Sequence, residues 1–163
     1  MLDLVMRTQP TLPPAVRSHP AGALGELAES IGDVSDTHAL VIGEHTLEMV
    51  CLLIRHGCIA AGTLRWHEKA ECGAVDLVVV PDLPDLQLLN EALRQARRAL
   101  LPNGRIVLHL APERPSAVAG LIFELLERHG FCAMHVTPQR DGSLIEAEAP
   151  FFGPSLHHQY PHH

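Results

Sequence analysis

The sequence predicts an α/β domain of three layers, in which helices cover both faces of a mostly parallel, six-stranded sheet. From residue 38 onward, short apolar runs alternate with segments whose apolar residues recur at helical spacing, and this alternation is typical of a parallel sheet. Residues 75–80 are apolar almost throughout, as expected for a strand covered on both faces. The pair Asp141-Gly142 favours a closing hairpin, which adds one antiparallel strand.

The first part of the chain is expected to contain an arm, two helices and two strands. Residues 1–20 hold four prolines and no periodic pattern, which indicates an extended Pro-rich arm. Helical spacing predicts a helix over residues 21–31 and a second over 46–56, each followed by a glycine. The second helix has one apolar face, made of Leu47, Val50, Cys51 and Ile54. Strands are expected at residues 39–42 and, more weakly, at 58–66.

The later part alternates in the same way. Asp85 can cap a helix that carries apolar residues on one face as far as Leu100, and Pro102-Asn103-Gly104 is expected to end it. Ser116 can cap the last helix. The expected elements are a strand at 75–80, a helix at 86–100, a strand at 105–110, a helix at 116–129 and strands at 131–137 and 144–149. We therefore expect one domain over residues 21–150, followed by a flexible His-rich tail, 151–163.

The composition excludes several classes of protein. Hydrophobic residues make up 47% of the 163 residues and charged residues 19%, so the chain is not wholly disordered. Twelve Lys and Arg against 19 Asp and Glu argue against a general nucleic-acid binder. We expect no membrane span, because no apolar run approaches the roughly 18 residues that one requires. Residues 1–20 have no secretory pattern, and the four cysteines lack close pairs, so we expect free thiols and a cytoplasmic location.

Three segments of this layout resemble the class I S-adenosylmethionine-dependent methyltransferase fold, a Rossmann-like fold, over residues 38–149. The run Ala39-Leu40-Val41-Ile42-Gly43, with the helix after it, resembles the family's first strand, glycine loop and first helix. The strand at 75–80 resembles the family's fourth strand, and residues 99–108 resemble the lead into its fifth. The last helix and the hairpin match the end of the fold. The resemblance implies S-adenosylmethionine as the cofactor.

The glycine loop departs from the family pattern. In the family, an acidic residue stands near the end of the first strand, and alternating glycines let the backbone approach the amino-acid part of the cofactor. Here Val41 stands at the acidic position. Gly43 is kept, but His45 and Leu47 stand where further glycines are expected. The loop is therefore degenerate as a cofactor site.

The second strand and the segment after it also depart from the pattern. The family holds the two ribose hydroxyls with an acidic residue at the end of this strand, and the matching position lies near Leu64, with Glu68 as a candidate substitute. Only eight residues separate Trp66 from Val75, whereas the helix and strand that the family fits there need roughly 15 or more. We therefore expect that one edge unit is missing.

Five residues are candidates for a cofactor or ligand site. In open α/β sheets, ligands bind at the carboxyl ends of strands where the strand order reverses. By resemblance, this is the cleft between the first strand and the strand at 75–80, lined by Gly43, Glu44, His45, Pro81 and Asp82. Glu44 or Asp82 could accept hydrogen bonds, and His45 could act as an acid or base near neutral pH. Alternatively, these are solvated loop residues. No catalytic residue can be named.

Two other groups of reactive side chains have simpler interpretations. Asp82 and Asp85 could form an acid–base pair, but helix capping explains them more simply. Zinc-type side chains occur at His56, Cys58, His67 and Cys72, but their spacing is irregular and we predict no metal site. Residues 157–163 hold four histidines, which indicates either weak adventitious metal binding or a biological metal role.

Two functions from different classes remain. The degenerate loop, the lost ribose ligand and the missing unit favour a non-catalytic binding or partner-interaction module on this scaffold. The alternative is a minimal S-adenosylmethionine-dependent methyltransferase acting on a small molecule or a protein. The bare sheet edge needs protection. We expect either that Phe151-Phe152 folds over it or that the protein self-associates or binds a partner there.

Overall fold

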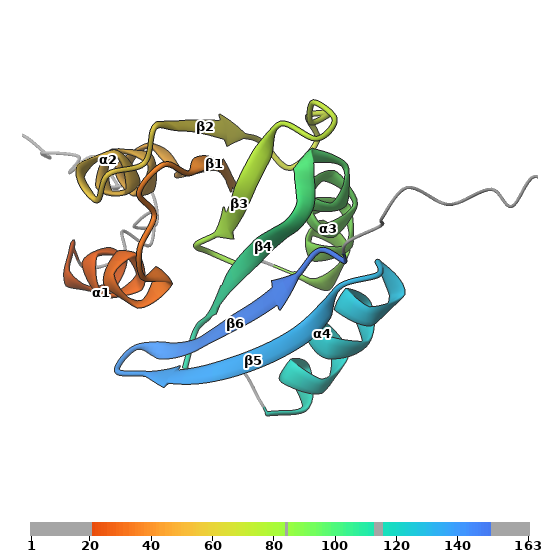
Figure 1. Ribbon diagram of the computed structural model, residues 1–163. Coiled ribbons are helices and arrows are strands. Elements are labelled where there is room, and N and C mark those ends of the chain that lie inside the picture. Colours follow the sequence, from red (N-terminus) through yellow and green to blue (C-terminus); the bar gives the residue numbers. More distant parts are fainter. Residues whose placement is uncertain (1–20, 84, 113–115, 151–163) are drawn as a thin grey trace, which may run out of the picture.

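The computed structural model describes residues 21–83, 85–112 and 116–150, and these form an α/β fold around one six-stranded sheet (Figure 1). The strand order is β2-β1-β3-β4-β6-β5. The strands are β1 (His38–Ile42), β2 (Ala60–Leu64), β3 (Val75–Val80), β4 (Leu100–Leu110), β5 (Cys132–Gln139) and β6 (Gly142–Glu148). The first four run parallel, whereas β6 is antiparallel to both of its neighbours. The predicted fold class is confirmed.

Four helices cover the two faces of the sheet. α1 (Ala21–Ile31) and α2 (Leu47–Arg55) pack on one face, and α3 (Leu86–Ala99) and α4 (Ser116–Arg128) on the other. Strand β3 shows the consequence for the sequence, because Leu77 and Val79 join the cluster under α1 and α2, whereas Val78 and Val80 join the cluster under α3 and α4. A strand buried on both faces has no polar face, which explains its nearly continuous apolar run.

The helix-to-strand connection at Ala99 differs from the prediction. α3 ends at Ala99, and β4 begins at once with Leu100, so the strand starts five residues before the expected Arg105. The expected turn survives as an irregularity inside β4, because Leu100 pairs with Val75 whereas Arg105 pairs with Leu77. Asn103 takes a left-handed backbone angle, φ 64°, within this bulge. Turn-forming residues can therefore sit within a strand when they bulge out of its ladder.

The orientation of α2 could not be predicted from its apolar pattern. Met49 and Leu53 are its fully buried residues. The apolar face that the sequence indicated contains Leu47, Cys51 and Ile54. Leu47 is 72% exposed, Ile54 is 46% exposed and Cys51 is also exposed. These three residues form a second apolar stripe, which faces away from the core.

The connection between β2 and β3 is short, and the edge unit that was expected to be missing is absent from it. The chain from Arg65 to Ala74 forms no helix or strand and crosses directly from one side of β1 to the other. It is tied to α3, because Ala70 N donates to Gln95 Oε1 at 2.8 Å and Arg98 Nε donates to Ala70 O at 2.7 Å. β2 consequently lies at one edge of the sheet. None of the helices in the described segments has the length and apolar character needed to cross a membrane.

Candidate functional site

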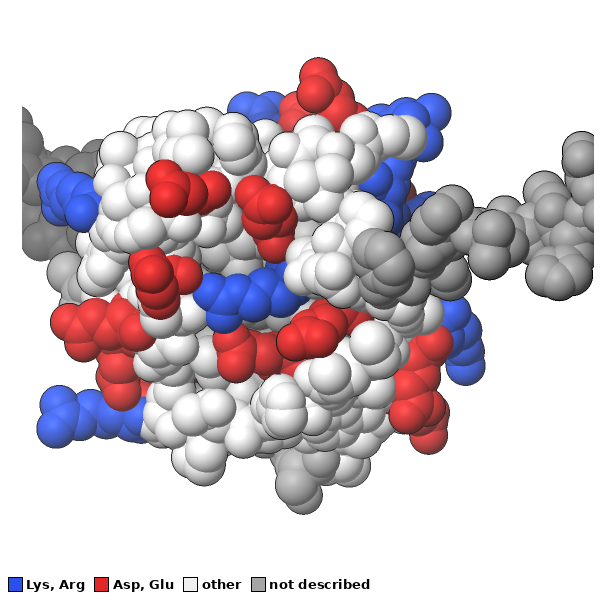
Figure 2. All heavy atoms as spheres, viewed as in Figure 1, with Lys and Arg blue, Asp and Glu red and all other residues white. Residues whose placement is uncertain are grey.

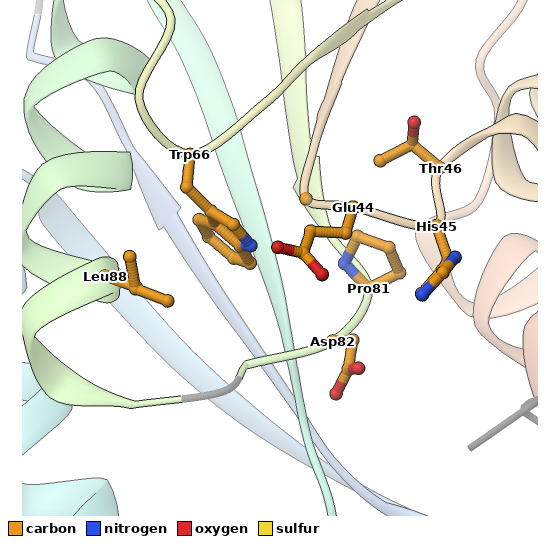
Figure 3. Close-up of a pocket in the computed structure, with 8 residues that line it drawn as sticks. Glu44, His45, Thr46, Trp66, Pro81, Asp82 and Leu88 are labelled. Carbon is orange, nitrogen blue, oxygen red and sulfur yellow. The ribbon is translucent and has the colours of Figure 1, made fainter. Parts of the chain in front are cut away.

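The candidate site is a small pocket at the carboxyl ends of β1 and β3 (Figure 3). Its volume is about 120 Å³. The five residues expected from the sequence all line it, together with three more; the full lining is Gly43, Glu44, His45, Thr46, Trp66, Pro81, Asp82 and Leu88. The pocket forms here because β1 has neighbours on both sides, and the chain leaves its end in a loop before α2.

Gly43 fixes the path of the loop above β1. Its backbone N–H donates to the carbonyl of Leu64 at 3.0 Å, which ties the loop to the end of β2. Its φ of 151° lies in a region that favours glycine. A Cβ at this position would lie 3.5 Å from Thr46 Cγ2 and 3.7 Å from Trp66 Cζ2, which are ordinary contacts. The backbone conformation, more than lack of space, therefore accounts for the glycine.

Trp66 forms the inner wall of the pocket, and sequence reasoning did not place it there. The residue is 5% exposed and belongs to the core cluster of α3 and α4, together with Leu64 and Ala70. Figure 3 shows the indole between Leu88 and Glu44, with the Glu44 carboxylate directed towards it. The available signal was its position two residues after the end of β2, an element whose carboxyl end lies at the same edge of the sheet as that of β1.

The polar groups of the pocket lie at its mouth. Glu44, His45 and Asp82 are exposed, and they bring two carboxylates and one imidazole around a floor of indole, proline and leucine. Asp85 does not join them in an acid–base pair, because its carboxylate accepts the backbone N–H of Leu88 at 2.8 Å and caps α3. The arrangement could accept hydrogen bonds from a polar ligand at the mouth, over an apolar floor.

The positions that hold the cofactor in the resemblance are apolar here. Val41 is fully buried in the cluster under α1 and α2, so no carboxylate stands at the end of β1. Leu64, at the end of β2, is also buried. The Glu68 carboxylate accepts the backbone N–H of Arg65 at 2.9 Å, and Glu68 does not line the pocket. Neither Leu64 nor Glu68 is placed to hold the two ribose hydroxyls.

The remaining candidates do not converge. Within the described ranges, no group of three or more His, Cys, Asp or Glu side chains is placed to hold a metal ion. Cys58 is buried, its Sγ donates to the carbonyl of Thr37 at 3.2 Å, and burial raises the pKa of its thiol, so it is a structural residue. Residues 1–20, the His-rich tail and Phe151-Phe152 lie outside the described residues.

Known structures share this architecture, although sequence comparison finds no relative. No family model matches the chain, and no curated protein matches it. A putative S-adenosylmethionine-dependent methyltransferase from Listeria monocytogenes superposes with a TM-score of 0.64 at 10% identity, covering 81% of this chain and 100% of that one. A TehB-like S-adenosylmethionine-dependent methyltransferase from Corynebacterium glutamicum gives 0.59 at 16% identity, covering 79% and 88%.

Other neighbours are longer proteins. The chain spans 54% of the pyocyanin biosynthetic protein PhzM, with a TM-score of 0.59 at 13% identity and 78% of this chain covered. It likewise spans 56% of a putative O-methyltransferase from Nostoc punctiforme. At these identities the likeness shows the fold alone. The protein thus has the class I S-adenosylmethionine-dependent methyltransferase fold, without the helix and strand that the family places between its second strand and the strand corresponding to β3.

Proposed function

We propose that this protein is a non-catalytic binding module that uses the methyltransferase scaffold to engage a partner. The observation that carries the proposal is the size of the pocket, about 120 Å³, with Trp66 as its inner wall. Pockets that enclose a cofactor-sized ligand measure roughly 300–1,000 Å³. A whole S-adenosylmethionine molecule would need more room between Gly43 and Leu88 than this arrangement leaves.

The chemistry around the pocket supports the same proposal. The cofactor's ribose hydroxyls would meet Leu64, an apolar residue, and the Glu68 carboxylate is already bonded to the backbone of its own turn. A polar group buried without a partner costs about 1–3 kcal/mol. Two such hydroxyls would remove much of the affinity that a cofactor site requires.

Calorimetric titration of the full chain with S-adenosylhomocysteine tests the proposal. We expect no binding at millimolar ligand by protein whose circular dichroism shows that it is folded. Gly43→Trp would block the pocket, and Gly120→Trp is the matched control, because Gly120 has open space around it on α4. Micromolar binding that is lost in Gly43→Trp and kept in Gly120→Trp would overturn the proposal and place the cofactor in this pocket.

The alternative is a minimal S-adenosylmethionine-dependent methyltransferase. It is supported by the glycine with positive φ at the end of β1 and by the polar mouth made of Glu44, His45 and Asp82. In that case the carboxylates would accept hydrogen bonds from a ligand, and His45 would take or give a proton near neutral pH. Transfer of labelled methyl groups from S-adenosylmethionine to a small molecule or a protein, abolished by Gly43→Trp, would establish this activity.

A further inference from the structure

We propose that the free edge of β2 and the exposed stripe of α2, made of Leu47, Cys51 and Ile54, form the contact between two copies of this chain. The two copies would pair their β2 strands antiparallel about a two-fold axis and continue the sheet from one molecule into the other. This contact is independent of whether the pocket binds a ligand. Because the connection between β2 and β3 is short, no strand among the described residues pairs with the outer edge of β2.

The surface is apolar and lies at one end of the molecule. Of the six large apolar side chains that stand out as exposed in the described part of the chain, three lie here: Leu47, Ile54 and Ile59, which precedes β2. Figure 1 shows α2 and β2 together at this end, and in Figure 2 uncharged surface lies there between charged side chains. An exposed apolar patch of this kind marks an interaction surface.

The two edge strands of the sheet, β5 and β2, differ in features that prevent pairing with another chain. β5 carries Pro138, and its pairing with β6 is irregular between Cys132 and His135, with Ala133 at φ 51°. Proline and bulges are common devices that prevent an edge strand from pairing with another chain. β2 has the sequence AAGTL, with no proline, no charge and an unbroken register along β1. Only the β2 edge is suited to pair.

The backbone of β2 offers a symmetric set of hydrogen-bonding groups. Leu64 O accepts from Gly43 N and therefore faces β1; because strand residues alternate, Ala61 and Thr63 direct their N–H and C=O groups to the free edge. A two-fold axis at Gly62 sets Ala61 of one copy opposite Thr63 of the other. Each of these two pairs can exchange two backbone hydrogen bonds.

The same axis brings the exposed stripes of the two α2 helices together. The axis stands perpendicular to the sheet, so both helices lie on the same face, run antiparallel and flank it. Paired strands lie about 4.8 Å apart and packed helices about 8–10 Å apart, so helices that cover the two β2 strands can touch. Leu47 of one copy would face Ile54 of the other, and the two Cys51 thiols would lie near the axis.

The lack of charge on this surface suits a second copy of the chain. The protein has a net charge of −7, which opposes self-association in general, but neither β2 nor the stripe carries a charge, so the copies meet here without repulsion.

Sedimentation of the full chain tests the contact. We expect a dimer whose dissociation constant rises about tenfold or more in Thr63→Pro, because this change removes an outward N–H from each copy. An edge strand tolerates proline where its N–H faces outward. Thr63→Val keeps the N–H and should dimerise normally. Ile54→Glu should also weaken the dimer, whereas Leu121→Glu, an equally exposed position on α4, should not.

Cross-linking locates the axis. In a variant with Cys72→Ser and Cys132→Ser, a short bismaleimide should link two chains through Cys51, and adding Cys51→Ser should abolish the link. A full chain that stays monomeric into the millimolar range would overturn the proposal. Protection of the Ala61 and Thr63 amides from hydrogen exchange in that monomer would show that another segment of the same chain covers the edge instead. A dimer unaffected by both Thr63→Pro and Ile54→Glu would equally overturn it.

Discussion

Trp66 illustrates what a single residue decides in this fold. The sequence placed Gly43, Glu44, His45, Pro81 and Asp82 around one cleft, because each directly follows a strand that ends at the same edge of the sheet. The signal for Trp66 was weaker, because the expected strand at 58–66 included it, and a tryptophan in a weakly patterned strand is equally compatible with the core or the surface. Its packing depends on the short connection to β3, which brings the indole back over the end of β1.

His129 should make stability depend on pH. Burial lowers the pKa of its imidazole, and the nearby Arg94 and Arg128 lower it further, against an opposing effect of Glu91. Its Nε2 lies 2.7 Å from Asn90 Oδ1. The unfolded chain therefore binds a proton more readily, at a pKa of about 6.5, and the folded state loses stability as the pH falls through that value.

Urea unfolding of the wild type and of His129→Gln at about pH 8 and about pH 5 measures this effect. The free energy of unfolding should fall more steeply towards acid in the wild type than in the variant. The other histidines are common to both proteins and cancel in the comparison. An equal slope in the two proteins would show that the His129 environment does not distinguish its charged and neutral forms.

At the scale of elements, the sequence predicted each helix and strand. It did not predict which face of α2 is buried or where β4 begins. α2 carries two apolar sets, Met49 with Leu53 and Leu47 with Ile54, and helical periodicity alone cannot rank them. The choice is made by the sheet that the helix must cover. β4 began early because Pro102-Asn103-Gly104 bulges within the strand, and a turn signal does not reveal whether pairing resumes on both sides.

Gly142 should control the final hairpin. It opens β6 at a φ of 131°, and a Cβ there would collide with the carbonyl oxygen of Leu110 at the end of β4. Gly142→Ala should therefore cost at least about 2 kcal/mol of unfolding free energy, from the clash and the backbone strain together. Gly120→Ala is the matched control; it adds a methyl group in open space on α4 and should stabilise by roughly 0.5–1 kcal/mol. Equal effects in denaturant unfolding would contradict this account.

At the scale of the whole molecule, the short connection between β2 and β3 affects both the pocket and the outer edge of β2, which no described strand pairs with. The same eight residues between Trp66 and Val75 replace the missing unit, carry the connection across β1 and leave β2 at the border of the sheet. The short connection was visible in the sequence, and it predicted six strands correctly. Its effects on the pocket wall and on α2 could not be predicted, because they depend on contacts between segments distant in sequence.

Thermal unfolding gives a whole-molecule test of the reduced pocket. A ligand that binds only the folded state at 1,000 times its dissociation constant adds about 4.1 kcal/mol of stability. For a domain of this size, each kcal/mol raises Tm by about 2–4 °C. If S-adenosylhomocysteine bound with micromolar affinity, a millimolar concentration would raise Tm by roughly 8–16 °C.

We expect no rise in Tm with S-adenosylhomocysteine, because Trp66 limits the pocket and the Leu64 side chain gives the ribose no acceptor. The protein concentration must be held constant, since a dimer through β2 would itself make Tm depend on it.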